Sequence, residues 1–445
     1  MTTSRLLPRL SIDGALAASL GFALVVLPGA GSGWYDDTRW TAASVALGGL
    51  AVTRALLAQR IAVGHLERLM IGALVVLALL IAFSSTWGVR GSEPVLETRR
   101  AVLYVTALVA LVVCVAHGSS RRLLEGAAAG ATVLATWGLV SRIFHPHAPS
   151  DPFEGTLLTT PIGYANALGV VAAMGVLTAV GLSAIAEPAH ASRSWRAAAS
   201  VLVSALVMTE SRGAALALIA GALVAVLVAP PLLRRRLAAT AAAASAPAAL
   251  VVLLVPRTSG VVLAAVIIGA AALAAAIPPV RIDRRTLAVA VVALGAAGMI
   301  AFVVRLSSGW SYRTDYWHVA VDSAWDHAPL GSGAGSFDDE WLRRRPVFVN
   351  VRDAHSLYLE TVAELGVAGL LLVGVLAAVP LVGAARFRHD AVVPVAAGAY
   401  ATFLVHAGID WDWEMPVVTL SALVAASAIL AAARPAPSAN APLER

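Results

Sequence analysis

Residues 162–185, IGYANALGVVAAMGVLTAVGLSAI, form an apolar run that contains no charged side chain. A run of about 20 such residues is long enough to cross the hydrocarbon core of a bilayer as a helix. Similar runs recur along the 445 residues, of which 59% are hydrophobic and only 13% charged. Soluble domains carry about 25% charged residues. The composition therefore excludes a soluble globular protein and a disordered chain, and it predicts an all-α, polytopic integral membrane protein.

The hydropathy pattern predicts about 12–14 transmembrane helices. Candidate spans lie at 11–30, 40–58, 66–86, 101–117, 123–143, 162–185, 195–210, 213–231, 237–255, 261–278, 286–304, 356–384, 391–408 and 414–433. We divide the chain into N-terminal transmembrane helices over 1–304, an extracytoplasmic loop over 305–355, C-terminal transmembrane helices over 356–433 and a disordered cytoplasmic tail over 434–445.

The arginines test this topology independently, because all 32 basic residues are arginine. With the N-terminus in the cytoplasm, nineteen arginines fall in cytoplasmic segments, seven in short outer loops and six in the loop 305–355. This excess satisfies the positive-inside rule, so both termini are predicted to be cytoplasmic. The net charge of +6 is therefore explained by arginines that set the orientation in the membrane, and it does not indicate affinity for nucleic acid.

The outer loop 305–355 is too long for a tight connection and too aromatic for a disordered linker. We expect it to fold as a cap at the membrane surface. Arg313 and Trp317 stand four residues apart, which places them on one face of a short helix. Gly331, Gly333 and Gly335 alternate with other residues, and such a loop can bring backbone N–H groups close to an anion. A plain flexible turn explains the same glycines.

His355 opens the predicted span 356–384 at the outer interface. Tyr358 and Leu359 follow it at helical spacing, and Glu360 and Glu364 share a helix face one turn apart. A histidine at this depth exchanges protons with water, and its ordinary pKa suits acid–base catalysis. The alternative is an interfacial histidine that only caps the helix.

Arg212 lies in a tight hairpin between two spans on the outer side. A guanidinium at the membrane surface can bind a diphosphate through two parallel hydrogen bonds. Pairing with Glu210 and contact with lipid phosphates are the alternatives.

Other polar residues of the outer loops carry less information. The spacing of His145, His147 and Asp151 fits no standard zinc or calcium site, so we predict no bound metal. Asn166 is interpreted as a helix cap. A further cluster contains two tryptophans that suit an aromatic belt and acidic residues without an evident role, and its members are His406, Asp410, Trp411, Asp412 and Trp413.

Taken together, these motifs resemble those of a known family, the O-antigen ligase and Wzy-type polymerase superfamily. The resemblance rests on Ser211-Arg212-Gly213, Arg313-x3-Trp317, Pro329-Leu330-Gly331-x-Gly333-x-Gly335-x-Phe337 and Ala354-His355-x2-Tyr358-Leu359-Glu360-x3-Glu364-Leu365-Gly366. It implies a membrane fold similar to the C-type glycosyltransferases. It also implies transfer of a glycan from a polyprenyl diphosphate carrier, such as undecaprenyl diphosphate, to an acceptor hydroxyl on the outer face of the bacterial inner membrane.

The resemblance further implies roles for single residues. His355 matches a histidine proposed to act as general base, and Arg212 and Arg313 match positions proposed to bind the diphosphate. Fixed arginines can neutralise the charge that builds on this leaving group. Supporting roles fall to Trp317, Gly331, Gly333, Gly335, Tyr358, Glu360 and Arg352. Ser356 departs from the asparagine common in the family, which bears on acceptor positioning.

The implied partners are a lipid-linked glycan donor, the bilayer and a hydroxyl-bearing glycan, lipid or protein acceptor. No cofactor and no nucleic acid is implied. Ligase, polymerase and protein O-glycosyltransferase share these motifs. Two other classes stay open: a transporter or flippase of lipid-linked oligosaccharide, which predicts charges near the bilayer midplane and broken helices in paired repeats, and a non-catalytic scaffold, in which His355 would be dispensable.

Overall fold

The computed structural model describes residues 12–434, except for 59–60, 90–92, 145–156, 188, 255–259, 280–281, 284, 287–288 and 290–311. The described part is helical and contains no strand. Its helices are α1 (Ile12–Ala30), α2 (Trp40–Leu57), α3 (His65–Phe83), α4 (Pro94–Cys114), α5 (Ser120–Phe144), α6 (Ala165–Ile185), α7 (Ala189–Met208), α8 (Arg212–Val228), α9 (Pro231–Leu254), α10 (Gly260–Ala276), α12 (Arg313–Asp326), α13 (Phe337–Arg344), α14 (Leu357–Arg386), α15 (Val392–His406) and α16 (Pro416–Ala432).

These helices form the bundle of a polytopic membrane protein. Each predicted span coincides with a helix, except the span 286–304, which lies outside the described residues apart from Thr286 and Val289. Six of the described helices are long and apolar enough to cross a bilayer, namely α1, α2 with the short turn before it, α3 with the short turn after it, α5, α6 and α14. Shorter apolar helices, including α8, α15 and α16, pack among them.

Burial separates central helices from peripheral ones. Nearly every side chain of α6 and α16 is buried, so neither helix has a distinct polar face and both are central helices. By contrast, α2 and α3 expose leucines and valines along one face, as expected for helices that face lipid. Glycines allow close contact between neighbours: a Cβ at Gly126 of α5 would lie 1.9 Å from the carbonyl oxygen of Ala18 on α1. Close contacts at small residues commonly stabilise the packing of membrane helices.

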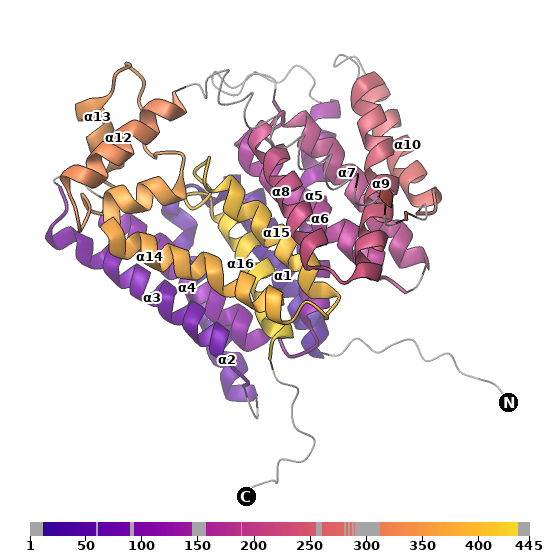
Figure 1. Ribbon diagram of the computed structural model, residues 1–445, viewed down its shortest axis with the longest axis horizontal. Coiled ribbons are helices and arrows are strands. Elements are labelled where there is room, and N and C mark those ends of the chain that lie inside the picture. Colours follow the sequence, from indigo (N-terminus) through magenta and orange to yellow (C-terminus); the bar gives the residue numbers. More distant parts are fainter. Residues whose placement is uncertain are drawn as a thin grey trace, which may run out of the picture.

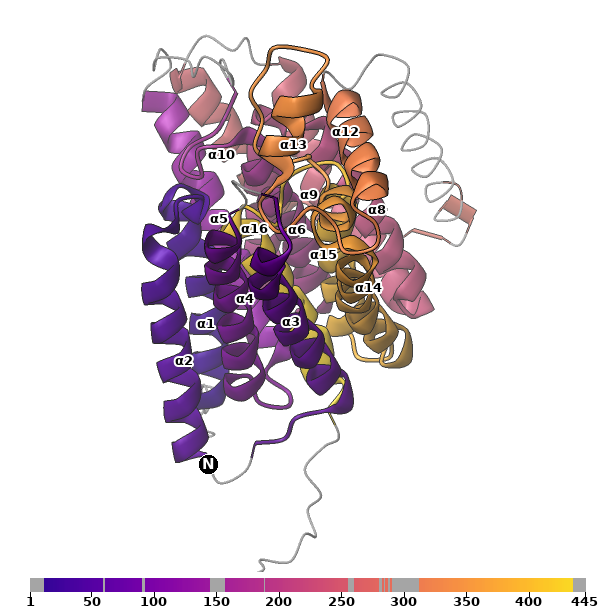
Figure 2. The same ribbon diagram turned by 90° about the vertical axis from the view of Figure 1, so that its left-hand side faces the viewer.

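Residues 312–355 form a cap at one end of the bundle, which we call the cap end (Figure 1). α12 and α13 lie there above the start of α14, and the second view shows them at the same end (Figure 2). The first described turn of α1 and the last turn of α16 lie at the opposite end. Both ends of the described chain thus lie on one side of the bundle.

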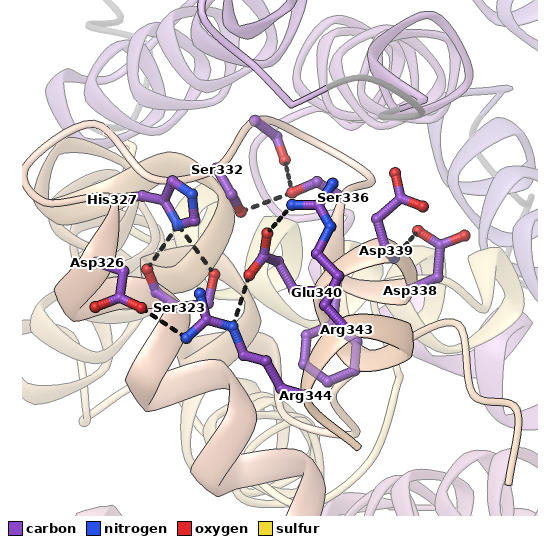
Figure 3. A network of polar contacts seen from close by, with 12 residues as sticks. Ser323, Asp326, His327, Ser332, Ser336, Asp338, Asp339, Glu340, Arg343 and Arg344 are labelled. Carbon is purple, nitrogen blue, oxygen red and sulfur yellow. Dashed lines mark hydrogen bonds and ion pairs between the residues drawn. The ribbon is translucent and has the colours of Figure 1, made fainter. Parts of the chain in front are cut away.

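The cap has its own core and its own ion pairs. Tyr316, Phe337 and Trp341 are buried together between α12, α13 and the start of α14. The carboxylate of Glu340, which is 1% exposed, accepts hydrogen bonds from Arg343 and Arg344 at 2.9 Å each. Arg344 also pairs with Asp326 at the end of α12, so this network joins the two cap helices (Figure 3).

α14 is interrupted at Gly366, where φ is 63° and ψ −160°. The loop of alternating glycines enters this break: the amide of Val367 donates to the carbonyl oxygen of Pro329, and the amide of Gly333 donates to that of Glu364. The predicted span 356–384 therefore corresponds to one element, α14, which contains a kink at Gly366. A glycine inside an apolar run gave no sign of the break, because its cause is a contact with residues more than 30 positions upstream.

The predicted tail needs a smaller correction. Arg434, which we assigned to the tail over 434–445, is 6% exposed and forms an ion pair with Glu67 of α3. It also donates to the carbonyl oxygens of Val112 and Val115 at the end of α4. The folded part therefore extends to Arg434, and the remainder of the tail lies outside the described residues.

Replacing Gly366 by alanine is expected to destabilise the protein by about 2–4 kcal/mol. A Cβ at this position would lie 1.9 Å from the carbonyl oxygen of Pro329, and φ lies in the left-handed region. Gly374 of the same helix is the matched control, because a Cβ there meets no atom within 4 Å. Thermal unfolding of the purified protein in detergent measures both variants. Equal unfolding temperatures for Gly366→Ala and Gly374→Ala would contradict this account of the break.

Candidate active site

His355 lies in the turn that connects the cap to α14. Its backbone adopts a left-handed conformation with φ of 55°, which is uncommon for a side chain other than glycine. Ser356 follows as the N-cap of α14, and its hydroxyl accepts a hydrogen bond from the amide of Leu359. Serine is a good N-cap, so the departure from asparagine at this position leaves the start of the helix intact.

The ring of His355 is fixed in one tautomer by its hydrogen bond. Nδ1 lies 3.0 Å from the carbonyl oxygen of Asp353. A carbonyl oxygen only accepts, so Nδ1 carries the proton and Nε2 presents the lone pair. This is the form of a neutral histidine that can take a proton from a hydroxyl group.

Two aromatic rings flank His355, one from the cap and one from the loop between α15 and α16. The ring of Tyr316 lies 5.3 Å from that of His355, and the ring of Trp411 lies 5.8 Å from it. Burial between these rings lowers the pKa of His355, and the charge of nearby Arg313 lowers it further against the opposing effect of Asp410. His355 is therefore neutral at neutral pH.

Asp410 is the centre of the polar contacts beside His355. Its carboxylate is 1% exposed and accepts hydrogen bonds from Arg313 at 3.0 Å, Tyr164 at 2.9 Å and Asn166 at 2.7 Å. The amide of Trp411 donates to the same carboxylate at 3.0 Å. Three segments that are far apart in sequence thus meet at one buried carboxylate.

Asp410 stays ionised in this setting. Burial alone would raise its pKa, but the charge of Arg313, together with smaller contributions from His406 and His355 when they are protonated, outweighs that effect, so the pKa lies below its ordinary value. Arg313 in turn uses one guanidinium nitrogen for Asp410, and its side chain is 16% exposed. The guanidinium has further donors that can receive an anionic ligand.

Arg212 starts α8, where the hydroxyl of Ser211 accepts the amide of Ala214 as an N-cap. The side chain of Arg212 is exposed, and within the described residues it forms no ion pair. A Cβ built on its neighbour Gly213 would lie 3.3 Å from Nε2 of His406 and 3.2 Å from Cδ1 of Ile409, the residue that immediately precedes Asp410. The structure therefore brings Arg313 and His355 together and places Arg212 next to the same loop, without contact between Arg212 and the other two side chains.

The other residues predicted to support the site stabilise the backbone and the helices around it. The hydroxyl of Tyr358 donates to the carbonyl oxygen of Leu404 on α15, and Glu360 accepts the amide of Ala354. Arg352 pairs with Glu93 at 2.7 Å on the surface. Trp317 packs, partly buried, against the core of the cap. These contacts fix the turn around His355 from several sides.

The backbone N–H groups of the glycine loop donate to a carboxyl group of the chain itself. The carboxyl group of Glu364 accepts hydrogen bonds from the amides of Gly335, Ser336 and Phe337 at 2.9, 2.9 and 3.0 Å. Gly331 and Gly333 have positive φ values of 77° and 99°. We interpret this loop as the clamp that holds the cap on α14, since its amides are already occupied.

Asp353, Glu360 and Glu414 are the described residues best placed to hold a metal ion, because their carboxylate oxygens lie within 4.8 Å of one another. Oxygen donors of this kind suit Mg²⁺ or Ca²⁺. Arg100, which is 2% exposed, pairs with Glu414 and with Glu97 and supplies positive charge to the same cluster. Desolvation raises the pKa of Asp353 to about 7, so part of this cluster binds protons at neutral pH.

Comparison with known proteins bears on the chain's family. Residues 197–374 match the family model described as O-Antigen ligase. This part of the chain is similar to the O-antigen ligase family. The match includes Arg212, Arg313 and His355, whereas Tyr164 and Asp410 lie outside it. No curated protein matches the chain. The match supports a membrane protein of the type that joins glycans, either a ligase or a polymerase.

Some residues of this candidate site were not predicted from the sequence. The pattern showed Asp410, Trp411 and Asn166 but gave them no shared role. Two tyrosines, Tyr164 and Tyr316, had no signal beyond their aromatic character. The one sequence feature that pointed to this part of the site was the group of charged residues around Asp410. A buried carboxylate requires a cation nearby, and only the fold shows that this cation is Arg313.

The protonation state of His355 predicts the pH dependence of the reaction. A general base must be neutral, so the turnover rate should fall as pH decreases through the lowered pKa of His355, below about 6.5, and should be level near pH 7. Initial rates of glycan transfer between pH 5 and 8 measure this, with His318→Ala, at an exposed position on α12, as the control. A rate that increases below pH 6 would contradict the role of His355 as base.

Proposed function

We propose that this protein transfers a glycan from a polyprenyl diphosphate carrier to an acceptor hydroxyl group at the outer face of the bacterial inner membrane. In this proposal the cap end faces away from the cytoplasm and both termini are cytoplasmic. His355 acts as the general base, and Arg313 and Arg212 bind the donor diphosphate. The partners are the lipid-linked glycan and a glycan, lipid or protein that carries the accepting hydroxyl.

One observation carries the proposal: a neutral histidine and a partly free guanidinium lie beside the same buried carboxylate. The ring of Trp411 packs on His355 while its amide bonds Asp410, and Asp410 holds Arg313. A base for the acceptor and a cation for the leaving group are thus adjacent at the cap end. Both are required when an uncharged hydroxyl displaces an anionic diphosphate.

The reaction follows from these two groups. The acceptor oxygen attacks the anomeric carbon of the donor sugar as Nε2 of His355 removes its proton. The bond between the anomeric carbon and the diphosphate oxygen breaks, and its electron pair stays on the diphosphate. Arg313 stabilises this increasing negative charge, and Arg212 reaches the same group from the start of α8.

The position of the break in α14 also supports an enzyme over a transporter. A transporter built from repeats predicts broken helices in pairs. The interruption at Gly366 is filled by the glycine loop of the cap, and no other described α-helix contains a residue with non-helical φ and ψ. The break therefore serves to attach the cap that covers His355.

The proposal is tested in a strain that lacks the gene. Polyprenyl-diphosphate-linked glycan is measured by mass spectrometry after complementation with the wild type or with His355→Ala. We expect carrier-linked glycan to accumulate outside the membrane and only the wild type to clear it. Single repeat units would identify a polymerase, and long chains a ligase. Clearance by His355→Ala would refute the catalytic assignment, and accumulation restricted to the inner leaflet would indicate a flippase.

A further inference from the structure

His406 and Asp412 form a buried pair that the proposed reaction does not use. His406 ends α15 and is 0% exposed, and its Nδ1 lies 2.8 and 2.9 Å from the two carboxylate oxygens of Asp412. Because a carboxylate accepts, Nδ1 carries the proton of this bond. Nε2 is buried and has no hydrogen-bond partner in the part of the chain that the structure describes. A buried polar atom without a partner requires an explanation.

The start of α8 lies directly against this ring. A Cβ built on Gly213 would lie 3.3 Å from Nε2 of His406 and 3.2 Å from Cδ1 of Ile409. Further along, α8 and α15 are in backbone contact, since a Cβ at Gly221 would lie 2.5 Å from the carbonyl oxygen of Gly398. The first turn of α8, which carries Arg212, therefore takes its position from His406.

The other side of the same turn of α15 holds the start of α14. The amide of Leu357 donates to the carbonyl oxygen of Ala407 at 2.8 Å, and the hydroxyl of Tyr358 donates to that of Leu404 at 2.7 Å. Leu357 lies two residues after His355. The end of α15 is thus in contact with the segment that carries the base and with the segment that carries Arg212.

The pair also belongs to the loop that holds Arg313. Asp410 lies between His406 and Asp412 in sequence, and the bond between these two closes the loop around it. The backbone reinforces the closure, because the hydroxyl of Thr419 on α16 donates to the carbonyl oxygen of Asp412 at 2.8 Å. A change in the pair would therefore displace Asp410 and α8 relative to each other.

We propose that His406 and Asp412 are positioning residues that set the spacing between Arg212 and the half of the site formed by His355, Asp410 and Arg313. This inference rests on the proposed function, in which both arginines engage one diphosphate. Arg212 has no ion pair with a described residue, so its distance from Arg313 depends on the packing of α8. His406 and Asp412 lie where the start of α8, the start of α14 and the loop that contains Asp410 meet, so they determine how α8 packs there.

Kinetics of the purified full-length protein in nanodiscs test this inference. The donor is lipid-linked glycan extracted from the strain that lacks the gene, and the signal is released polyprenyl diphosphate. We expect His406→Leu to lower kcat by about 100-fold with a smaller change in KM, since displacements of about 1 Å cost this much. His406→Asn should recover most of the loss, because its amide N–H can replace Nδ1. His389→Leu, at an exposed site outside this region, is the matched control.

The decisive comparison is made in an Arg212→Ala background. If His406 acts through Arg212, His406→Leu lowers kcat there by less than about threefold. The same 100-fold loss in both backgrounds would overturn the inference while leaving the proposed function intact, whereas an Arg212→Ala variant with wild-type kcat would overturn both. If His406→Leu fails to fold, Gly213→Ala replaces it: the added methyl group separates α8 from the ring and should lower kcat about tenfold, and wild-type kcat would overturn the inference.

Discussion

Replacing His355 by alanine should lower the rate of glycan transfer by about 10²–10⁴-fold, the contribution typical of a positioned general base. The ring is held in the basic tautomer by the carbonyl oxygen of Asp353, so its removal leaves no group to take the proton from the acceptor. The effect should appear in kcat more than in KM, since the proton moves only in the transition state. Single-turnover rates with extracted lipid-linked glycan measure it.

The fold should tolerate this substitution. The N-cap by Ser356 and the hydrogen bonds of Tyr358 and Glu360 hold the turn without the imidazole ring. His318→Ala, on the exposed side of α12, controls for loss of a cap histidine and should retain full activity. A His355→Ala protein with more than about one tenth of the wild-type rate would show that another group is the base.

The second large effect is expected at the pair formed by Arg313 and Asp410. Arg313→Ala leaves a buried carboxylate without its cation, which should lower the free energy of unfolding by about 3 kcal/mol and abolish transfer. Combining it with Asp410→Asn removes the uncompensated charge, so stability should largely return while transfer stays lost. Thermal unfolding and transfer rates, measured on both proteins, separate the two roles of Arg313.

Arg343 on the cap provides the matched control, because its side chain is 53% exposed and it pairs only across one helical turn. Arg343→Ala should have little effect on either quantity. Recovery of transfer in the Arg313→Ala, Asp410→Asn double variant would mean that Arg313 is structural and that the diphosphate is bound elsewhere.

The membrane bundle could be predicted from the sequence because its signal is local. A run of apolar residues near 20 long identifies a spanning helix whatever surrounds it, and the predicted spans match the described helices. The break at Gly366 could not be predicted in this way. Its cause is the glycine loop that enters α14 from 329–336, and a single glycine in an apolar run does not report a contact so distant.

In the candidate site, too, local features could be predicted from the sequence and contacts between distant segments could not. Arg313 and His355 were singled out by residue type and spacing, but their proximity depends on Asp410, which is 97 positions from Arg313. The glycine loop was expected to bring backbone N–H groups close to an anion, whereas the group that accepts their hydrogen bonds, the carboxyl group of Glu364, required the fold. Buried ion pairs between distant segments are the part of a site that the sequence leaves undetermined, since each partner alone resembles an interfacial charge.

Release of polyprenyl diphosphate from its glycan in proteoliposomes that contain only this protein tests the central claim most directly. Extracted lipid-linked glycan and an acceptor fraction from the same strain are supplied, and both the free carrier and the glycosylated acceptor are quantified by mass spectrometry. The account predicts equal amounts of the two products with the wild type and a loss of at least about 100-fold with His355→Ala. Intact donor that only changes leaflet, or equal product from both proteins, would contradict it.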